Sequence, residues 1–280
     1  MLGKLIKHEF KDTYKLICVY YAVLGLLTIL GIITVKGTYS MQSASVLLRI
    51  LMVISVAAYS VMMGILGIVT IMVLCSQFEK TMYGDRGYLT HTLPVKKGEI
   101  LASKYIVSVV WCIASLFVMF LSLMIYGSFL SGDNLFHMLF AEITDLQWQS
   151  IDRFAQENFG CGLIPFLLLA IVTLIVAVMH LFSFLWAAIS IGQLANERRK
   201  PLAIFTGIIL WLAEFLIKRA IQNILHLPFD GGFLEMVVET AVPGPRVDQA
   251  ILLYLIMTLV FLSIETFVTW FISSKRLNLA

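Results

Sequence analysis

Three ionisable side chains, His180, Glu214 and Glu265, lie inside long apolar stretches of this 280-residue chain. Charge is costly at membrane depth, so residues of this kind pair with one another or mark a pathway for ions or protons. Lys218 follows Glu214 by four residues, a spacing that places an ion pair on one face of a helix. Two interpretations stay open. Either Glu214 lines a polar pathway or locks two subunits together, or its pair with Lys218 only fixes one helix in a bundle.

A second group of residues could bind a partner protein and lies at residues 76–102, between the second and third apolar stretches. Residues 77–83 predict a short helix, and residues 84–87 predict a turn. Apolar side chains such as Tyr88 and Leu89 follow in a basic segment, where they fit a socket on another protein or fold back into the lipid interface. The predicted docking residues are Phe78, Met82, Tyr83, Arg86, Tyr88, Leu89, Leu93 and Lys96.

The first residues of the chain carry an amphipathic pattern. Taken as a helix, residues 2–17 place apolar side chains on one face and four lysines on the opposite face. This pattern predicts a basic amphipathic helix over residues 1–15 that lies in the membrane interface and is attracted to anionic lipid. Such a helix either serves only as a topology anchor or also touches a cytoplasmic partner. Its predicted interfacial residues are Lys4, Lys7, Phe10 and Lys11.

The elements that position these residues are predicted to be membrane helices. The chain is 60% hydrophobic and 13% charged, with a mean hydropathy of +0.94, whereas a soluble domain carries about 25% charged residues. A membrane-spanning helix needs about 20 apolar residues. We therefore predict an all-α integral membrane protein that forms a single membrane domain over residues 1–280. The six predicted transmembrane helices are 16–35, 47–75, 103–130, 163–191, 202–222 and 250–272.

The distribution of basic residues predicts the orientation in the membrane. Of the 20 Lys and Arg residues, 14 lie on one side of the predicted spans, and the positive-inside rule assigns this side and both termini to the cytoplasm. Residues 131–162 and 223–249 are then extracellular, and the second segment either re-enters the membrane or forms a plain external segment. Small residues four apart, such as Ala188 and Gly192, predict close helix packing.

Several classes of chemistry find no support in the sequence. The net charge of +3 gives no reason to expect a nucleic-acid partner. No Gly-x-x-x-x-Gly-Lys-Ser/Thr phosphate loop occurs, and His8 and Glu9 resemble the start of a metalloprotease motif in which Asp12 replaces the second histidine. The four cysteines form no CxxC pair. We therefore predict no catalytic residue, no metal site and no directly bound cofactor.

The segment 78–104 resembles a loop of a known family. Residues 87–97 read GYLTHTLPVKK and residues 99–104 read EILASK. Both are similar to the cytoplasmic loop of permease subunits in the type 2 family of ATP-binding-cassette exporters, especially those of Gram-positive bacteria. The amphipathic N-terminus, the six spans and an extracellular insertion before the last span also match this family.

The resemblance implies a permease subunit of an ATP-driven exporter in the bacterial cytoplasmic membrane. In that family the loop contains a coupling helix that sits in a cleft of a separate ATPase subunit, which holds ATP and Mg. Two permease subunits pair, as a homodimer or a heterodimer, and export an amphiphile such as a peptide or drug. Two alternatives remain: a proton- or ion-coupled secondary carrier that uses Glu214, Glu265 and His180, and a non-transporting immunity or scaffold protein.

Overall fold

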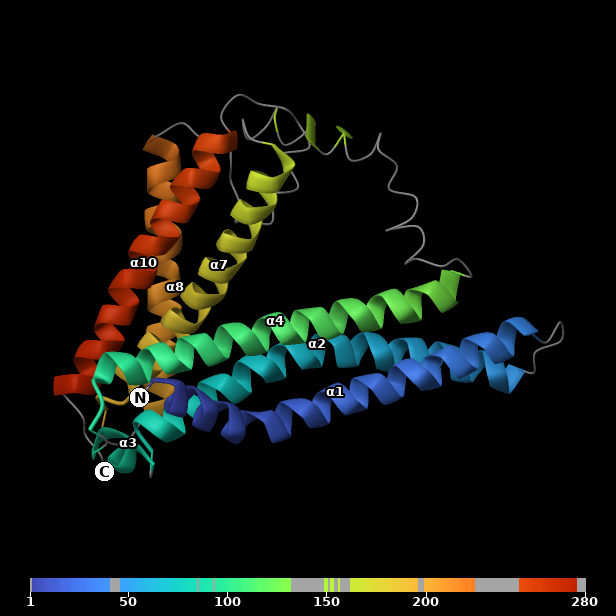
Figure 1. Cartoon of the computed structure of the whole chain (residues 1–280), viewed down its shortest axis with the longest axis horizontal. Helices are drawn as coiled ribbons and strands as arrows, with labels where there is room; N and C mark the ends of the chain where they lie inside the picture. Colours follow the sequence, from blue (N-terminus) through green and yellow to red (C-terminus); the bar gives the residue numbers. More distant parts are fainter. Residues whose placement is uncertain are drawn as a thin grey trace. The chain divides into compact units, whose positions relative to one another are not determined.

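A computed structural model describes most of the chain as long helices (Figure 1). The described residues are 2–40, 46–84, 86–92, 94–131, 149–150, 152–153, 156, 162–195, 199–224 and 247–275. The named helices are α1 (Leu2–Ser40), α2 (Val46–Met82), α3 (Gly87–Thr92), α4 (Lys97–Ser131), α7 (Leu163–Gly192), α8 (Arg199–Ile224) and α10 (Val247–Lys275). None of the described residues lies in a strand. Six of these helices are long and apolar enough to cross a membrane, which confirms the predicted all-α, multi-pass class.

The helices extend beyond the predicted spans. α2 has 37 residues and is therefore about 55 Å long, whereas the hydrocarbon core of a bilayer is about 30 Å thick. The helix predicted over 77–83 is confirmed through Met82, but it is the end of α2 and not a separate short helix; a turn at Tyr83 and a bend at Gly84 follow it. The amphipathic segment 1–15 is helical from Leu2 and continues without a break into the first predicted span as α1.

The described helices divide into two compact units, although the sequence suggested a single membrane domain. The N-terminal unit contains Met1–Gln77 and Ile106–Asp145, and the C-terminal unit contains Phe78–Tyr105 and Leu146–Ala280. The last residues of α2, α3 and the start of α4 therefore belong with α7, α8 and α10. The two predicted external segments, 131–162 and 223–249, lie mostly outside the described residues.

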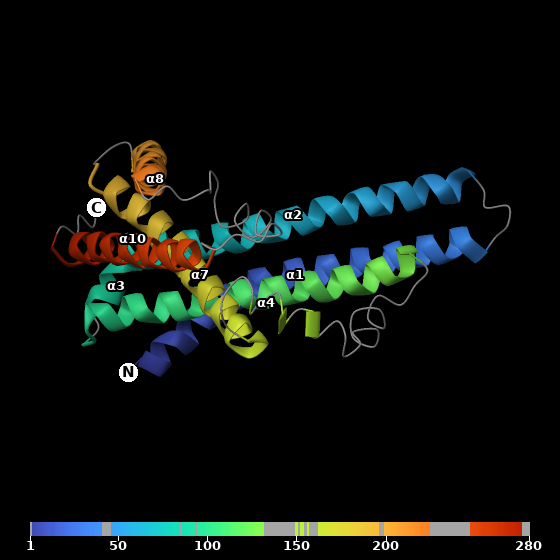
Figure 2. The ribbon, with the colours of Figure 1, turned by 90° about the horizontal axis from the view of Figure 1, so that it is seen from above.

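In the N-terminal unit, α1 runs beside α2 and α4 (Figure 2). Its buried core consists of Leu24, Tyr59, Met62, Leu66 and Tyr126. The rings of Tyr59 and Tyr126 lie 4.4 Å apart between centroids. A methyl group added at Gly31 would lie 2.2 Å from the Tyr126 ring, so α1 approaches α4 closely at this glycine.

Hydroxyl groups join the same three helices in two layers. In the first layer, the Ser115 hydroxyl of α4 lies 2.8 Å from the Tyr21 hydroxyl of α1 and 3.1 Å from the Thr70 hydroxyl of α2. In the second layer, the Ser122 hydroxyl lies 2.8 Å from that of Thr28 and 3.1 Å from that of Tyr59. Each layer therefore links α1, α4 and α2 through a single serine.

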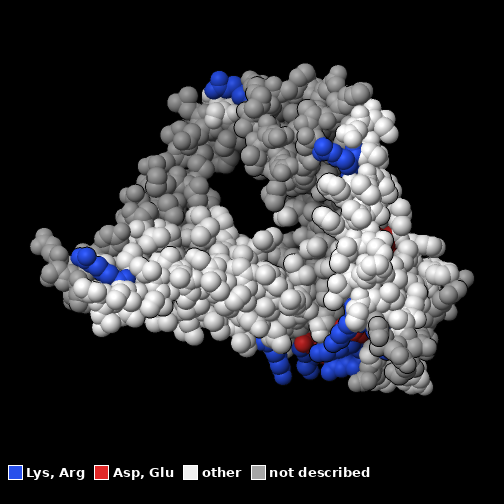
Figure 3. Space-filling model, turned by 180° about the vertical axis from the view of Figure 1, so that it is seen from behind, with Lys and Arg blue, Asp and Glu red and all other residues white. Residues whose placement is uncertain are grey.

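In the C-terminal unit, α7 packs against both α8 and α10. Small residues allow the close approach of α7 and α8. A Cβ atom at Gly207 would lie 3.6 Å from Ala188 Cβ, and one at Gly192 would lie 2.6 Å from Ala203 Cβ. This contact confirms the packing role predicted for Ala188 and Gly192. On the face drawn in Figure 3, most of the described surface along the helices carries no charged side chain, as expected for helices that face lipid.

Candidate functional site

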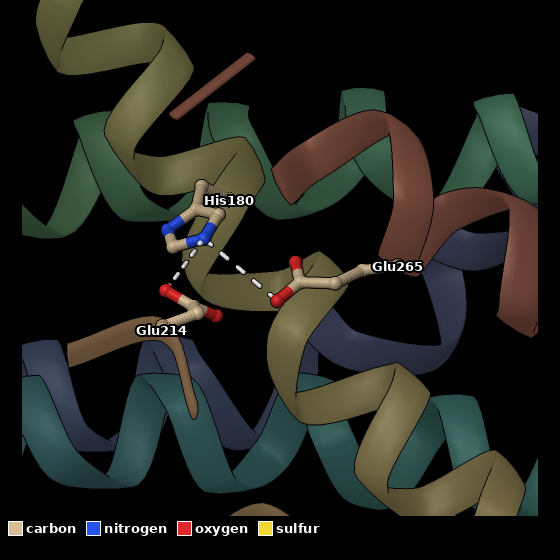
Figure 4. A group of neighbouring side chains, drawn as sticks. All are labelled: His180, Glu214 and Glu265. Atoms are coloured by element: carbon tan, nitrogen blue, oxygen red, sulfur yellow. Dashed lines mark ion pairs between the residues drawn. The ribbon is translucent and has the colours of Figure 1, made fainter. Parts of the chain in front are cut away.

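Three ionisable side chains from three helices converge inside the C-terminal unit (Figure 4). His180 comes from α7, Glu214 from α8 and Glu265 from α10. His180 Nε2 lies 3.3 Å from Glu214 Oε2 and 3.8 Å from Glu265 Oε1. The three side chains are only 17%, 12% and 6% exposed, respectively. We call this group the triad.

Two further polar side chains hold the carboxylates of the triad. Ser183, one helical turn after His180 on α7, donates a hydrogen bond of 2.6 Å to Glu265 Oε2. Lys218 donates a hydrogen bond of 3.1 Å to Glu214 Oε2, which confirms the predicted ion pair. The Lys218 ammonium also lies over the rings of Tyr254 and Phe261 of α10, at 5.8 and 5.2 Å from their centroids. Cation–π contacts of this kind stabilise a charged amine away from water.

Two atoms of the triad are buried without a hydrogen-bond partner among the described residues. They are His180 Nε2 and Glu214 Oε1. A neutral imidazole whose lone pair faced two carboxylate oxygens at 3.3 and 3.8 Å would be electrostatically unfavourable. A proton on Nε2 removes this conflict, because the nitrogen then donates to the carboxylates, and a metal ion between the three groups removes it as well. The triad therefore has the chemistry to hold either a proton or a metal ion at this position.

The sequence had singled out all four ionisable members of this site, namely His180, Glu214, Lys218 and Glu265. The structure supplies two partners, Ser183 and His180. The sequence missed Ser183 as a polar ligand, although its position three residues after His180 places both on one face of α7.

A second candidate surface lies on the α3 loop, which we define as residues 83–96 between α2 and α4. The backbone N–H of Gly87 donates to the carbonyl of Gly84 at 2.7 Å, which confirms the turn predicted over 84–87. α3 then exposes Tyr88 and Leu89, whose surfaces are 67% and 66% accessible. Exposed Arg86 and Lys96 flank them, as predicted, whereas Leu93 lies outside the described residues.

Three of the predicted docking residues are instead buried. Phe78, Met82 and Tyr83 are 1%, 2% and 4% exposed, so they cannot present their side chains to a partner. The reason is that α2 continues through them and packs against α7. The Phe78 ring stacks on the Trp186 indole at 4.6 Å between centroids. Of the predicted docking residues that the structure describes, only Arg86, Tyr88, Leu89 and Lys96 remain exposed.

Polar contacts anchor both ends of the α3 loop in the C-terminal unit. The Tyr83 hydroxyl donates to Ser190 Oγ at 2.8 Å, and burial raises the pKa of Tyr83 from 10.0 to about 12, so this donor keeps its proton at neutral pH. At the start of α4, Lys97 donates to the carbonyl of Ser274 at 3.0 Å. Lys104 is 3% exposed and donates to the Thr81 hydroxyl near the end of α2.

The N-terminal segment belongs to the other unit. Lys4, Lys7 and Lys11 are exposed on α1, as the amphipathic pattern predicts. Phe10 is only partly exposed and packs on Trp111 of α4, with ring centroids 5.6 Å apart. The apolar face of this segment is therefore partly used in packing against protein.

No family model, curated protein or solved structure matches this chain. The function of the chain is therefore inferred from the buried triad and from the exposed α3 loop.

Proposed function

We propose that this chain is the permease subunit of an ATP-driven exporter and that the α3 loop docks a separate ATPase subunit. The exposed pair Tyr88–Leu89 carries the proposal. Two large apolar side chains protrude from a short helix outside the long apolar segments, beside the exposed cations Arg86 and Lys96. An apolar centre with a charged rim is typical of a protein-binding surface, and the resemblance of residues 87–104 to a coupling loop agrees with it.

The anchoring of the loop supports a mechanical role. α3 is connected directly to the buried end of α2 and the start of α4. Phe78 at the end of α2 stacks on Trp186 of α7, and Lys97 at the start of α4 bonds the carbonyl of Ser274 in α10. A force that an ATPase applies to α3 would therefore act on α7 and α10. Such coupling between two conformations is how ATP hydrolysis in one subunit can move another.

The orientation follows from the same proposal. The loop and both termini would lie in the cytoplasm of a bacterial cell, where ATP is available, in agreement with the excess of basic residues on that side. ATP and Mg would be held by the partner, and a second permease subunit, identical or related, would complete the exporter. The substrate class that we infer is an amphiphile, such as a peptide or a drug.

Substitutions on α3 test the docking surface. We expect Tyr88→Asp and Leu89→Asp each to weaken binding of the ATPase by about 2 kcal/mol or more, because a charge replaces a central apolar contact. Thr92→Asp is the matched control, since Thr92 is exposed on the same short helix and is not a large apolar residue. The measurement is the amount of ATP-hydrolysing subunit that co-purifies with each variant from the native membrane.

The melting temperature of each variant separates a loss of ATPase binding from a loss of folding. The melting temperatures of the purified permease variants should match the wild type, because Tyr88 and Leu89 are exposed. If Tyr88→Asp and Leu89→Asp retain as much ATPase as Thr92→Asp, the docking surface is wrong.

A second candidate, an ion- or proton-coupled carrier, is favoured by the triad. Buried carboxylates and a histidine at membrane depth are typical of proton relays. This alternative predicts that vesicles containing only this chain take up protons, followed with a trapped pH-sensitive dye, and that Glu214→Gln abolishes the uptake. Uptake that is absent without the ATPase favours the exporter.

A further inference from the structure

We propose that His180, Glu214 and Glu265 form a binding site for one divalent transition-metal ion of the zinc class. One ligand atom from each residue, an imidazole nitrogen or a carboxylate oxygen, lies within 4.8 Å of the other two. The three side chains come from α7, α8 and α10 and point toward one another (Figure 4). The inference is independent of the exporter proposal, since it concerns neither the α3 loop nor a partner.

The distances fit the coordination geometry of such an ion. Zinc binds histidine nitrogen and carboxylate oxygen at about 2.0–2.2 Å, so two ligand atoms of a tetrahedral ion lie about 3.3 Å apart. His180 Nε2 and Glu214 Oε2 are 3.3 Å apart, and His180 Nε2 and Glu265 Oε1 are 3.8 Å apart. Small side-chain rotations are therefore enough to bring three ligands around one ion, with a fourth position left for water.

The unpartnered atoms point to the same ligand. His180 Nε2 and Glu214 Oε1 are buried, and neither has a hydrogen-bond partner among the described residues. Both are common metal-binding atoms, and one imidazole with two carboxylates suits Zn²⁺ and its neighbours in the first transition row better than Ca²⁺ or Mg²⁺, which prefer oxygen alone.

The surrounding residues resemble those that orient metal ligands in proteins. Carboxylate ligands are usually held by hydrogen bonds from neighbouring groups. Ser183 supplies such a bond to Glu265, at 2.6 Å, whereas the Lys218 ammonium lies 3.1 Å from Glu214 Oε2, the oxygen that would bind the ion. The lysine competes with a metal for Glu214, but the aromatic rings of Tyr254 and Phe261 offer its ammonium other favourable contacts.

A bound ion would tie three helices together. α7, α8 and α10 each contribute one ligand, so the metal would be released when these helices separate. Any ion that binds only the folded arrangement stabilises that arrangement. Metal binding should therefore raise the melting temperature of the purified chain.

The test uses the full-length chain, purified in detergent through a tag without histidine. Zn²⁺ binding is measured by competition with a chromophoric chelator, and Co²⁺ is used as a spectroscopic substitute. We expect one saturable Zn²⁺ site per chain. Co²⁺ bound at this site should show visible absorption bands typical of a coordination shell that contains a nitrogen ligand. Glu265→Gln and His180→Ala should each weaken Zn²⁺ binding by more than about tenfold.

Two control variants make the test sharp. Lys218→Met removes the competing ammonium but no ligand, so Zn²⁺ should bind more tightly to this variant. His8→Ala removes a histidine on an exposed part of α1, beside Asp12, and should leave the affinity unchanged. An increase in one variant and a decrease in another cannot come from general damage to the fold.

Two results would overturn the metal-site proposal. A wild-type chain that binds no Zn²⁺ or Co²⁺ in a saturable manner overturns the metal site and leaves a proton as the cation of the triad. Binding that is unchanged in Glu265→Gln but lost in His8→Ala also overturns it, because the ion is then held at the surface. Neither result bears on ATPase docking, which is measured separately on α3.

Discussion

The ring of Phe78 lies almost parallel to the indole of Trp186, with an interplanar angle of 6° and 4.6 Å between centroids. Trp186 also contacts Tyr105 of α4 and Phe182 of α7, at 4.6 and 5.6 Å between ring centroids. These aromatic contacts join the end of α2 and the start of α4 to α7. They explain why the segment around the α3 loop belongs to the C-terminal unit.

A double-mutant cycle should measure the Phe78–Trp186 contact. We compare the free energies of unfolding of Phe78→Leu, Trp186→Phe and the double variant, by denaturant titration in mixed micelles. The expected interaction energy is about 1 kcal/mol, because stacked aromatic pairs contribute this much beyond buried area. In a control cycle, a substitution of the exposed Phe205 replaces that of Trp186, and the changes in the free energy of unfolding of the two single variants should add. Additivity in both cycles would show that the stacking adds nothing.

Replacing Tyr83 by Phe should remove the bond to Ser190 and cost about 1 kcal/mol of stability at neutral pH. The pKa of Tyr83 is raised from 10.0 to about 12 by burial, so the folded state holds this proton more tightly than the unfolded chain. The resulting stabilisation is complete below pH 10 and is lost as the pH rises toward 12. Unfolding titrations across this range should fall more steeply for the wild type than for Tyr83→Phe. Parallel curves would contradict the burial of the phenol.

Alanine should destabilise the chain at Gly192 but not at Gly64. A Cβ at Gly192 would lie 2.6 Å from Ala203 Cβ and 2.8 Å from the Arg199 carbonyl oxygen. Gly192→Ala should therefore destabilise the chain by about 1–3 kcal/mol through overpacking between α7 and α8. No described atom lies within 4 Å of a Cβ at Gly64, so Gly64→Ala should be neutral or stabilise α2 by up to about 1 kcal/mol. The melting temperatures of the two variants decide the matter, and equal shifts would refute the close α7–α8 approach.

Ser115→Ala removes two hydrogen bonds between helices, those to Tyr21 and Thr70. Because such bonds average about 0.6 kcal/mol in membrane proteins, we expect a loss of about 1 kcal/mol. The control is Ser60→Ala, since Ser60 is exposed and its hydroxyl donates to the carbonyl of Val56 in its own helix. Its free energy of unfolding should stay within about 0.5 kcal/mol of the wild type. A loss in the control as large as in Ser115→Ala would mean that the serine bridge contributes nothing of its own.

The membrane helices were predictable because apolar length alone identifies them. Glu214 and Lys218 were also predictable as a pair, since both lie on one helix at a spacing of four residues. The convergence of His180, Glu214 and Glu265 was not, because nothing in three separate helices indicates which faces will meet. For the same reason, no sequence pattern indicated the metal site that we propose at these three residues.

The end of α2 was mispredicted for a related reason. The sequence predicted a short helix over 77–83 outside the second span, whereas α2 itself continues through Met82, and Glu79 accepts a hydrogen bond of 3.4 Å from Gln193 in the C-terminal unit. A tertiary hydrogen bond of this kind satisfies a polar side chain and lets the helix continue beyond the end of its apolar pattern. The burial of Phe78 and Met82 follows from the same packing and is invisible in the local sequence.

The two serine layers of the N-terminal unit restrict its motion. Ser115 and Ser122 lie seven residues apart on α4, and their partners Tyr21 and Thr28 have the same separation on α1. Sliding α4 by a single residue would break the bonds of both layers together, with no water in the hydrocarbon to replace them. The two layers therefore favour a single register of α1, α2 and α4 and oppose sliding of these helices past one another.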